Sequence, residues 1–338
     1  MRFISYTSTD TYYEFVGENG EKMLIPSTDV VLVDDESGAI SVKNTASRST
    51  IGYLIKGSTP PTPPAFQGKW LATYSDSSTT SAECDASSAI TNGEITLTDL
   101  VSVEIGDCVT SIEDNAFYSA SSLTSVIIPD SVTTIGKSAF VYCYSLASID
   151  IPNSVTTIGN NAFSYCSGLT SVDIPSGVTK IDNYTFRWCH SLSSVTIPDT
   201  VTSIGSNAFN QCVSLTSIDI PSGVTSITSN AFNTCIGLTS IDIPNSVTTI
   251  GNYAFQNCTG LTSCTIGSGI TTINRSAFAF CTSLTSVTIN AATPPTLGDS
   301  GVFSETNDCP IYVPAASVDT YKSASGWSDY ASRIQAIQ

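Results

Sequence analysis

The sequence has few charged residues, and most of those are acidic. Charged side chains make up 12% of its 338 residues, where soluble domains average about a quarter. The 12 lysines and arginines stand against 29 aspartates and glutamates, which gives a net charge of −17. Because proteins that bind phosphate backbones need clustered lysine and arginine, we expect no nucleic-acid partner. Serine, threonine and asparagine must form most of the surface.

Long apolar runs are also missing. No stretch of about 18 apolar residues occurs, so we expect no membrane span. The first residues, MRFISYTSTD, lack the apolar segment and the small-residue cleavage site of a signal peptide. The sequence therefore favours a way out of the cell other than the standard secretory route.

Histidine occurs once, as His190. A catalytic triad needs a base beside its nucleophile, and no motif pairs His190 with a serine or cysteine. We therefore expect neither catalytic residues nor a cofactor, and a surface or packing role for this imidazole.

The sequence does contain an internal repeat of 23 residues. Its leucine column runs from Leu123 to Leu284 and its isoleucine column from Ile112 to Ile273. The phenylalanine column consists of Phe117, Phe140, Phe163, Phe186, Phe209, Phe232, Phe255 and Phe278. Columns in a common register predict eight stacked units, because a single unit cannot bury its apolar edge alone.

Each unit predicts a strand, a turn and a short helical segment. Leu169, Val172 and Ile174 fit the L-x-x-L-x-L strand, and Pro175 ends its pairing. The A-F-x-x-C-x-x-L segment, with apolar residues three apart, predicts one or two helical turns. A glycine column predicts turns with positive φ, and its members are Gly136, Gly159, Gly205 and Gly251. Departures from the pattern predict local irregularity in the last two units, and these are Asp182, Thr228, Cys264, Gly267 and Asn274.

The repeated pattern S-L-T-S-V-x-I-P-x-S-V-T-x-I-G-x-x-A-F-x-x-C resembles the BspA-like leucine-rich repeat over residues 100–290. That family is known from surface proteins and adhesins of gut and oral bacteria, and from virion proteins of phages that infect them. The resemblance implies an α+β, β-rich solenoid and a binding function rather than catalysis.

The pattern and its flanks divide the chain into five parts. Residues 1–56 predict a small β module, with hairpins at Asn19-Gly20 and at residues 34–38. Because this module is too small for a large core of its own, we expect it to dock or to form a homodimer or homotrimer. The remaining parts are a proline-rich linker (57–65), an N-terminal cap with Trp70 and Cys84 beneath it (66–108), the solenoid (109–290) and a C-terminal cap (291–338). In the last part, residues 318–337 predict one or two short helices.

The cysteine column is the most conspicuous chemical feature, and it consists of Cys143, Cys166, Cys189, Cys212, Cys235, Cys258 and Cys281. Metal sites need ligands that converge on one point, whereas stacked units place these side chains in a parallel row. Parallel side chains also fit a disulfide poorly. The pattern favours buried, reduced thiols that pack, with metal or redox use as the alternative.

Two further columns are candidate binding sites. Acidic residues occupy an outward strand position, namely Asp150, Asp173, Asp219 and Asp242, with Thr196 between them. They form either a solvated acidic stripe or a site for Ca²⁺ or a partner. Aromatic and basic residues gather around the cysteines in three consecutive units, namely Tyr142, Tyr144, Tyr165, Arg187, Trp188 and His190. They either shelter the cysteine column or form a contact patch for a glycan or protein.

Together these features favour a non-enzymatic virion protein of a tailed phage, located on the virion surface as a head or tail fibre or decoration. Its N-terminal module would bind other virion proteins, and its solenoid would bind a host-surface glycan or protein. A bacterial cell-surface adhesin with the same repeats is the alternative.

Overall fold

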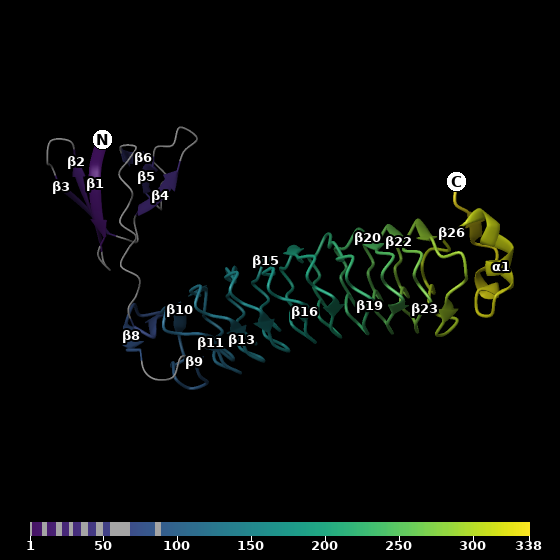
Figure 1. Cartoon of the computed structure of the whole chain (residues 1–338), viewed down its shortest axis with the longest axis horizontal. Coiled ribbons are helices and arrows are strands. Elements are labelled where there is room, and N and C mark those ends of the chain that lie inside the picture. The colour runs from purple at the N-terminus through teal and green to yellow at the C-terminus, as the bar shows by residue number, and fades with distance from the viewer. Residues whose placement is uncertain are drawn as a thin grey trace. The chain divides into compact units, whose positions relative to one another are not determined.

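The structure is a computed structural model of the whole chain, and it describes residues 68–84 and 89–338 together with six strands before them. The chain forms two compact units, Met1–Gln67 and Gly68–Gln338 (Figure 1). The predicted linker, residues 57–65, lies outside the described residues, as do the turns of both predicted hairpins.

The first unit contains a six-stranded sheet with the order β3-β2-β1-β6-β5-β4. Its strands are β1 (Arg2–Ser8), β2 (Tyr12–Gly17), β3 (Lys22–Pro26), β4 (Val30–Asp34), β5 (Ile40–Asn44) and β6 (Thr50–Leu54). The pairs β2–β3 and β4–β5 are antiparallel, as the two predicted hairpins require. Strands β1 and β6 pair in parallel and join the two halves of the sheet.

The second unit is a β-solenoid of about 11 turns of about 23 residues, which confirms the predicted fold class. One row of short strands comprises β10 (Leu100–Ile105), β12 (Ser125–Ile127), β15 (Ser171–Asp173), β17 (Ser194–Thr196), β20 (Ser240–Ile243), β22 (Ser263–Ile266), β24 (Ser286–Ile289), β26 (Ile311–Val313) and β27 (Ile334–Ala336). The other comprises β9 (Ala89–Ile90), β11 (Ser111–Ile112), β13 (Thr134–Ile135), β14 (Thr157–Ile158), β16 (Lys180–Ile181), β18 (Ser203–Ile204), β19 (Ser226–Ile227), β21 (Thr249–Ile250), β23 (Thr272–Ile273) and β25 (Thr296–Leu297). The two rows lie on opposite sides of the coil (Figure 1).

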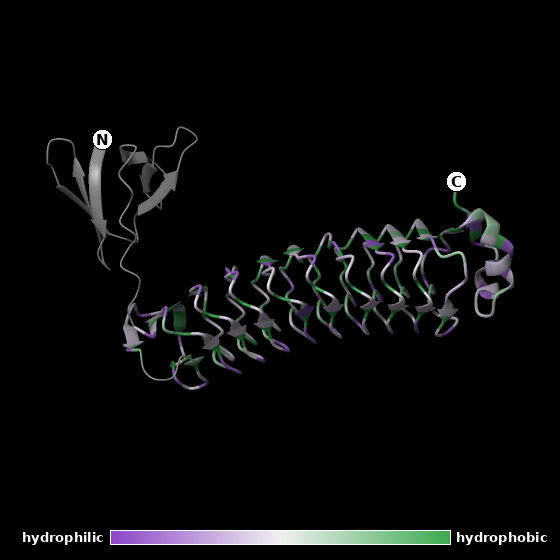
Figure 2. Cartoon of the chain, viewed as in Figure 1, coloured by the Kyte–Doolittle hydropathy of each residue, from purple (hydrophilic) through white to green (hydrophobic). Residues whose placement is uncertain are grey.

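The core between the two rows is built from the predicted columns. Apolar and polar segments alternate along each turn (Figure 2). Every phenylalanine from Phe117 to Phe278 in the column is fully buried. Neighbouring rings stack nearly parallel, with centroids 5.1 Å apart between Phe117 and Phe140 and 5.6 Å between Phe163 and Phe186. The repeat therefore produces one continuous aromatic stack along the solenoid.

The predicted helical turns are absent from the repeat units, so that prediction was wrong. The N–H of Phe140 donates to the carbonyl of Ala162 in the next turn at 2.8 Å, whereas the N–H of Cys143 donates to the carbonyl of Phe140 at 3.2 Å. The φ of Tyr142 is +65°. The segment is therefore a series of tight turns whose alternate N–H groups bond to the neighbouring unit. Apolar residues three apart suit this arrangement as well as a helix.

The glycine column serves close packing rather than positive φ, which corrects the second local prediction. Among the described glycines, only Gly93 and Gly326 have a positive φ. A Cβ on Gly205 would lie 2.5 Å from the backbone nitrogen of Asn183 in the preceding turn. A glycine at this position lets the backbones of adjacent turns approach each other.

We predict that Gly205→Ala destabilises the solenoid by about 2 kcal/mol, because the added methyl group overlaps backbone atoms that cannot move independently. Gly223→Ala is the matched control, since its Cβ would meet its nearest atom, the carbonyl oxygen of Val201, at an ordinary 3.4 Å. Urea unfolding of both variants gives the comparison. Equal losses of stability would contradict the close-approach explanation.

The irregular position in this column is Asp182, in the fourth unit. Strands β14 and β16 belong to different sheets, so the ladder is interrupted there. Thr228 and Asn274 also replace glycine, but their side chains donate to the carbonyls of Ile204 at 2.8 Å and Ile250 at 3.0 Å. The last two units pair continuously through β20, β22 and β24. The predicted location of the irregularity was therefore wrong.

The coil extends beyond the eight units at both ends. Strand β9 pairs with β11, and β10 pairs with β7 (Trp70–Tyr74), which pairs in turn with β8 (Thr79–Ala82). A disulfide joins Cys84 and Cys108, which the sequence did not predict. Trp70 is buried, as predicted, and donates to Glu94 at 3.0 Å, whereas Cys84, which was also predicted to lie beneath the cap, is exposed because it pairs with Cys108 at the edge of the coil.

At the C-terminal end, Phe303 extends the ring stack at 5.5 Å from Phe278. Helix α1 (Val318–Ser323) and two 3₁₀ turns (Ala315–Ser317 and Ser328–Tyr330) follow β26. Tyr321 and Trp327 are fully buried and donate to the carbonyls of Ala291 and Pro295. The helices predicted over residues 318–337 stop short of their expected end, because residues 334–336 form strand β27, and Ile337 is exposed.

Candidate functional site

The residue two places after each phenylalanine has a left-handed backbone. The φ angle is +65° at Tyr142, +63° at Tyr165 and +64° at Trp188, and it is +59° at Asn257 in a later unit. Left-handed backbone is unfavourable for bulky residues, and asparagine tolerates it best. Polar residues occupy this position in four of the eight units, and aromatic residues occupy it in three consecutive units, at Tyr142, Tyr165 and Trp188, and again at Phe280.

The structure brings all six predicted aromatic and basic residues together. Ring centroids lie 4.8 Å apart between Tyr142 and Tyr165, and 5.4 Å apart between Tyr165 and Trp188. Tyr144 contacts Tyr142 at 5.8 Å, and His190 contacts Trp188 at 5.2 Å. The guanidinium carbon of Arg187 lies 5.8 Å from the ring centre of Tyr165.

Sequence reasoning missed two members of this group. Tyr118 contacts Tyr142 edge to face at 5.5 Å, and Tyr184 lies under the guanidinium of Arg187 at 5.6 Å. Tyr118 follows its phenylalanine by one residue and Tyr184 precedes its own by two, so neither shares the repeat position of the other rings. We call the eight residues the aromatic row, and they are Tyr118, Tyr142, Tyr144, Tyr165, Tyr184, Arg187, Trp188 and His190.

The cysteine column does not need the aromatic row for shelter. Cys166 and Cys189, beside the aromatic residues, are fully buried. Cys235 and Cys258 are buried to the same degree, although Thr234 and Asn257 replace the aromatic residues in their units. The comparison favours the second interpretation of the row, as a contact patch.

Two donors in the row have no acceptor. Within the described part of the chain, the Nε of Arg187 and the Nε1 of Trp188 are buried without a hydrogen-bond partner. A buried donor that loses its partner costs about 1–3 kcal/mol. The two N–H groups therefore mark the part of the row whose hydrogen bonding is least satisfied.

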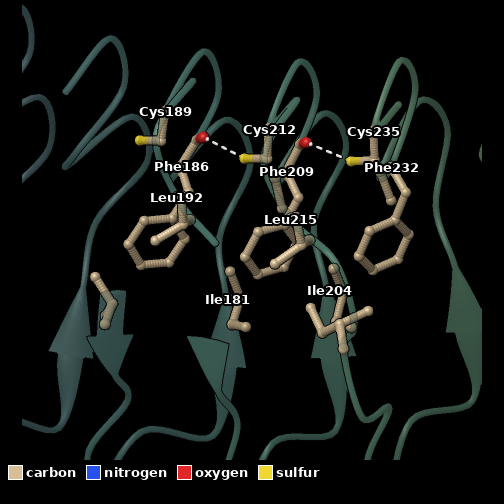
Figure 3. Close-up of a cluster of buried hydrophobic side chains, with 14 of the residues drawn as sticks. Ile181, Phe186, Cys189, Leu192, Ile204, Phe209, Cys212, Leu215, Phe232 and Cys235 are labelled. Carbon is tan, nitrogen blue, oxygen red and sulfur yellow. Dashed lines mark hydrogen bonds between the residues drawn. The ribbon is translucent and has the colours of Figure 1, made fainter. Parts of the chain in front are cut away.

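The cysteines form a hydrogen-bonded ladder (Figure 3). The thiol of Cys212 donates to the carbonyl oxygen of Phe186 at 3.2 Å, and that of Cys235 to Phe209 at the same distance. Burial raises the pKa of the Cys235 thiol to about 12 and that of Cys212 well above its ordinary value. Neutral, buried thiols are poor nucleophiles and metal ligands. The predicted burial of these thiols outside disulfides is confirmed.

The acidic column is exposed to solvent at all four predicted positions. In adjacent strands, Asp173 lies opposite Thr196, and Asp242 lies opposite Thr265. Across residues 68–84 and 89–338, no three histidine, cysteine or acidic side chains converge as metal ligands would. The same part of the chain has no helix long and apolar enough to cross a membrane.

A stack of short parallel strands with inward leucine, isoleucine and phenylalanine columns defines the chain as a leucine-rich-repeat solenoid protein. Within that class, it belongs to the BspA type leucine rich repeat region family, which matches in six copies over residues 89–214 and 179–307. No curated protein sequence matches the chain.

Solved structures of bacterial leucine-rich-repeat proteins are similar to this chain. A leucine rich repeat protein of T. pallidum is 30% identical, with 48% of this chain and 78% of that one covered and a TM-score of 0.44. A leucine rich cell surface protein of Faecalibacterium prausnitzii is 28% identical, with 82% and 95% covered and a TM-score of 0.39. The pneumococcal vaccine antigen PcpA is 16% identical, with 99% and 98% covered and a TM-score of 0.42.

Proposed function

We propose that this chain is a non-enzymatic binding protein displayed outside the cell, and that the aromatic row contacts a surface glycan or protein. The observation that carries the proposal is the row itself. Four of its rings, those of Tyr142, Tyr165, Tyr184 and Trp188, lie on left-handed backbone, and two of its buried N–H groups lack acceptors. The rings pack on one another, but this packing leaves the two N–H groups without acceptors, and a bound ligand would supply them.

Display outside the cell is supported by the Cys84–Cys108 disulfide, because disulfides persist in oxidising surroundings and are rare in the cytosol. It is also supported by the family, since the similar Faecalibacterium protein is described as a cell surface protein. A bacterial cell surface is therefore our first choice of location.

The virion surface is the second candidate. The separate compact unit formed by Met1–Gln67 favours it, because a particle-bound protein needs a docking part distinct from its binding part. The proposal includes a homodimer or homotrimer formed through this unit, whose mass light scattering would measure.

We predict that an antibody against the solenoid labels the outside of intact cells that produce the protein. Membrane-impermeant labelling of the same cells, before and after reduction, should modify Cys84 and Cys108 only after reduction. The buried cysteine column is the internal control, since its thiols should stay unlabelled until the protein is denatured. Labelling of purified phage particles alone would select the virion instead. Antibody signal confined to broken cells would contradict both locations.

A further inference from the structure

Arg187 is a cation without a carboxylate partner. Its guanidinium lies between the rings of Tyr165 and Tyr184, at 5.8 and 5.6 Å from their centres. Among the described ion pairs, none involves Arg187. It is the only arginine between Arg48 and Arg275, in a chain with a net charge of −17. Arg187 is therefore a positive charge that no described acid of this chain neutralises.

The same solenoid contains a paired version of this arrangement. The guanidinium of Arg275 lies 5.7 Å from the ring centre of Tyr253, and its Nε is 3.5 Å from a carboxylate oxygen of Asp299. In both sites an arginine lies over a tyrosine ring, but only Arg275 also has a carboxylate of this chain within ion-pair distance. At Arg187 no described carboxylate takes that place, so the guanidinium is free to pair with a carboxylate of a ligand.

The two buried N–H groups of the row also favour a ligand that carries a carboxylate. The buried Nε of Arg187 and Nε1 of Trp188 are donors without acceptors. A carboxylate supplies two acceptor oxygens and a negative charge, and charge-assisted hydrogen bonds to guanidinium are among the strongest in proteins. Because both N–H groups are buried, binding requires the two side chains to turn so that these groups face the ligand.

The geometry of the rings also limits which class of ligand can bind. Tyr165 and Trp188 stack on each other with an interplanar angle of 16°, so their facing surfaces are not available to a third ring. The exposed large apolar residues of the row are Tyr118 and Tyr144, and both carry hydroxyl groups. Arginine and aromatic residues are also common in protein interfaces, but the centre of such an interface is usually apolar. A surface of hydroxyl groups and unpaired donors suits a polyhydroxylated chain better.

We propose that the part of the aromatic row around Arg187 binds an acidic saccharide, with the sugar carboxylate on the guanidinium of Arg187 and on Trp188 Nε1. This inference rests on the proposed binding function and specifies its ligand class. Trp188 and Tyr165 then act mainly as a support that orients Arg187, rather than as a platform on which a sugar ring stacks.

The test is isothermal titration calorimetry of the full chain with oligosaccharides of galacturonic, glucuronic and sialic acid, each beside its neutral counterpart. We expect at least one acidic oligosaccharide to bind about tenfold or more tightly than its neutral partner, and to weaken as salt is added. Arg187→Gln should remove that difference, and Arg187→Lys should restore part of it. Trp188→Phe, which keeps a ring but not the N–H, should weaken binding about threefold or more.

Arg275→Gln is the matched control, because it removes an arginine that lies on a tyrosine but already has an acid partner. It should leave saccharide affinity unchanged, and circular dichroism should confirm that every variant is folded. Equal binding of acidic and neutral sugars, equal effects of the two glutamine variants, or no binding to any acid would overturn the inference. Tighter binding of an oligoglutamate peptide would overturn the saccharide assignment. If the saccharide experiment fails but surface labelling succeeds, the ligand class is wrong and the proposed display outside the cell still holds. If surface labelling fails, the proposed display outside the cell is wrong, whatever the saccharide experiment gives.

Discussion

Raising the pH above 9 is expected to destabilise the solenoid steeply, by several kcal/mol per pH unit. Burial raises the pKa of seven thiols, namely Cys166, Cys189, Cys212, Cys235, Cys258, Cys264 and Cys309, and a hydrogen bond with Cys258 together with burial raises that of Cys281. In the unfolded chain these thiols lose their protons near pH 8.5, whereas in the folded chain they keep them.

The sign follows from the direction of these shifts. A raised pKa in the folded state gives stability that is complete below about pH 8.5 and is lost as pH rises toward the folded value, which for Cys235 is about 12. Each thiol contributes about 1.4 kcal/mol per pH unit within its window, so the eight of them give a slope of up to about 11 kcal/mol per unit.

Urea unfolding between pH 7 and pH 10 in oxygen-free buffer measures this slope. Cys235→Ala is the internal check, because it removes one titrating thiol and should reduce the slope by about 1.4 kcal/mol per pH unit. Its cost at pH 7 should be about 1–2 kcal/mol and come mainly from the cavity left by the sulfur, since the lost hydrogen bond ends on a carbonyl, Phe209, that also accepts the N–H of Cys212. A free energy of unfolding that stays flat from pH 8 to pH 10 would refute the burial argument.

Sequence periodicity predicted the core because burial in a solenoid depends on position within the unit. Phe209, Cys212 and Leu215 repeat at the right interval, and all three are fully buried. The same spacing misled the prediction of helix, since residues three apart face one side of a helix and also one side of consecutive turns. A helix and a series of turns differ in the acceptors of their N–H groups, and here alternate N–H groups donate to carbonyls of the next unit.

The site was predictable in part for the same reason. Tyr142, Tyr165 and Trp188 share a repeat position, so stacking of the units had to place them side by side. The position of Arg187 between two tyrosines depends on Tyr184, which occupies another repeat position. The orphan donors depend on local side-chain packing, and no spacing in the sequence encodes them.

The disulfide was missed because neither Cys84 nor Cys108 belongs to the repeated column. Their separation of 24 residues is close to one turn of the coil, and this near match was the available signal. In a stack, residues one turn apart lie near each other, so two cysteines outside the column could be tested for pairing on that ground alone.

Phe209→Ala is expected to cost about 3–5 kcal/mol of folding free energy, which is the usual cost of emptying a fully buried phenylalanine site. Phe209 has no exposed surface and lies between the rings of Phe186 and Phe232, at 5.5 and 5.4 Å. The loss should fall at the upper end of this range, because the ring also contributes about 0.5–1.5 kcal/mol for each aromatic contact beyond its buried area.

Urea unfolding of the Phe209→Ala and Phe280→Ala variants tests this expectation, because both variants lose the same side chain and differ only in its burial. Phe280 is 45% exposed and lies outside the ring stack, so its removal should change stability by less than about 1 kcal/mol. The double variant Phe209→Ala, Phe232→Ala should cost less than the sum of the two single changes, because the contact between the rings is then lost only once. If the two single costs simply add, the rings do not stabilise each other. Each phenylalanine of the column would then stabilise only its own unit, and contacts between neighbouring rings would add nothing to the free energy of unfolding.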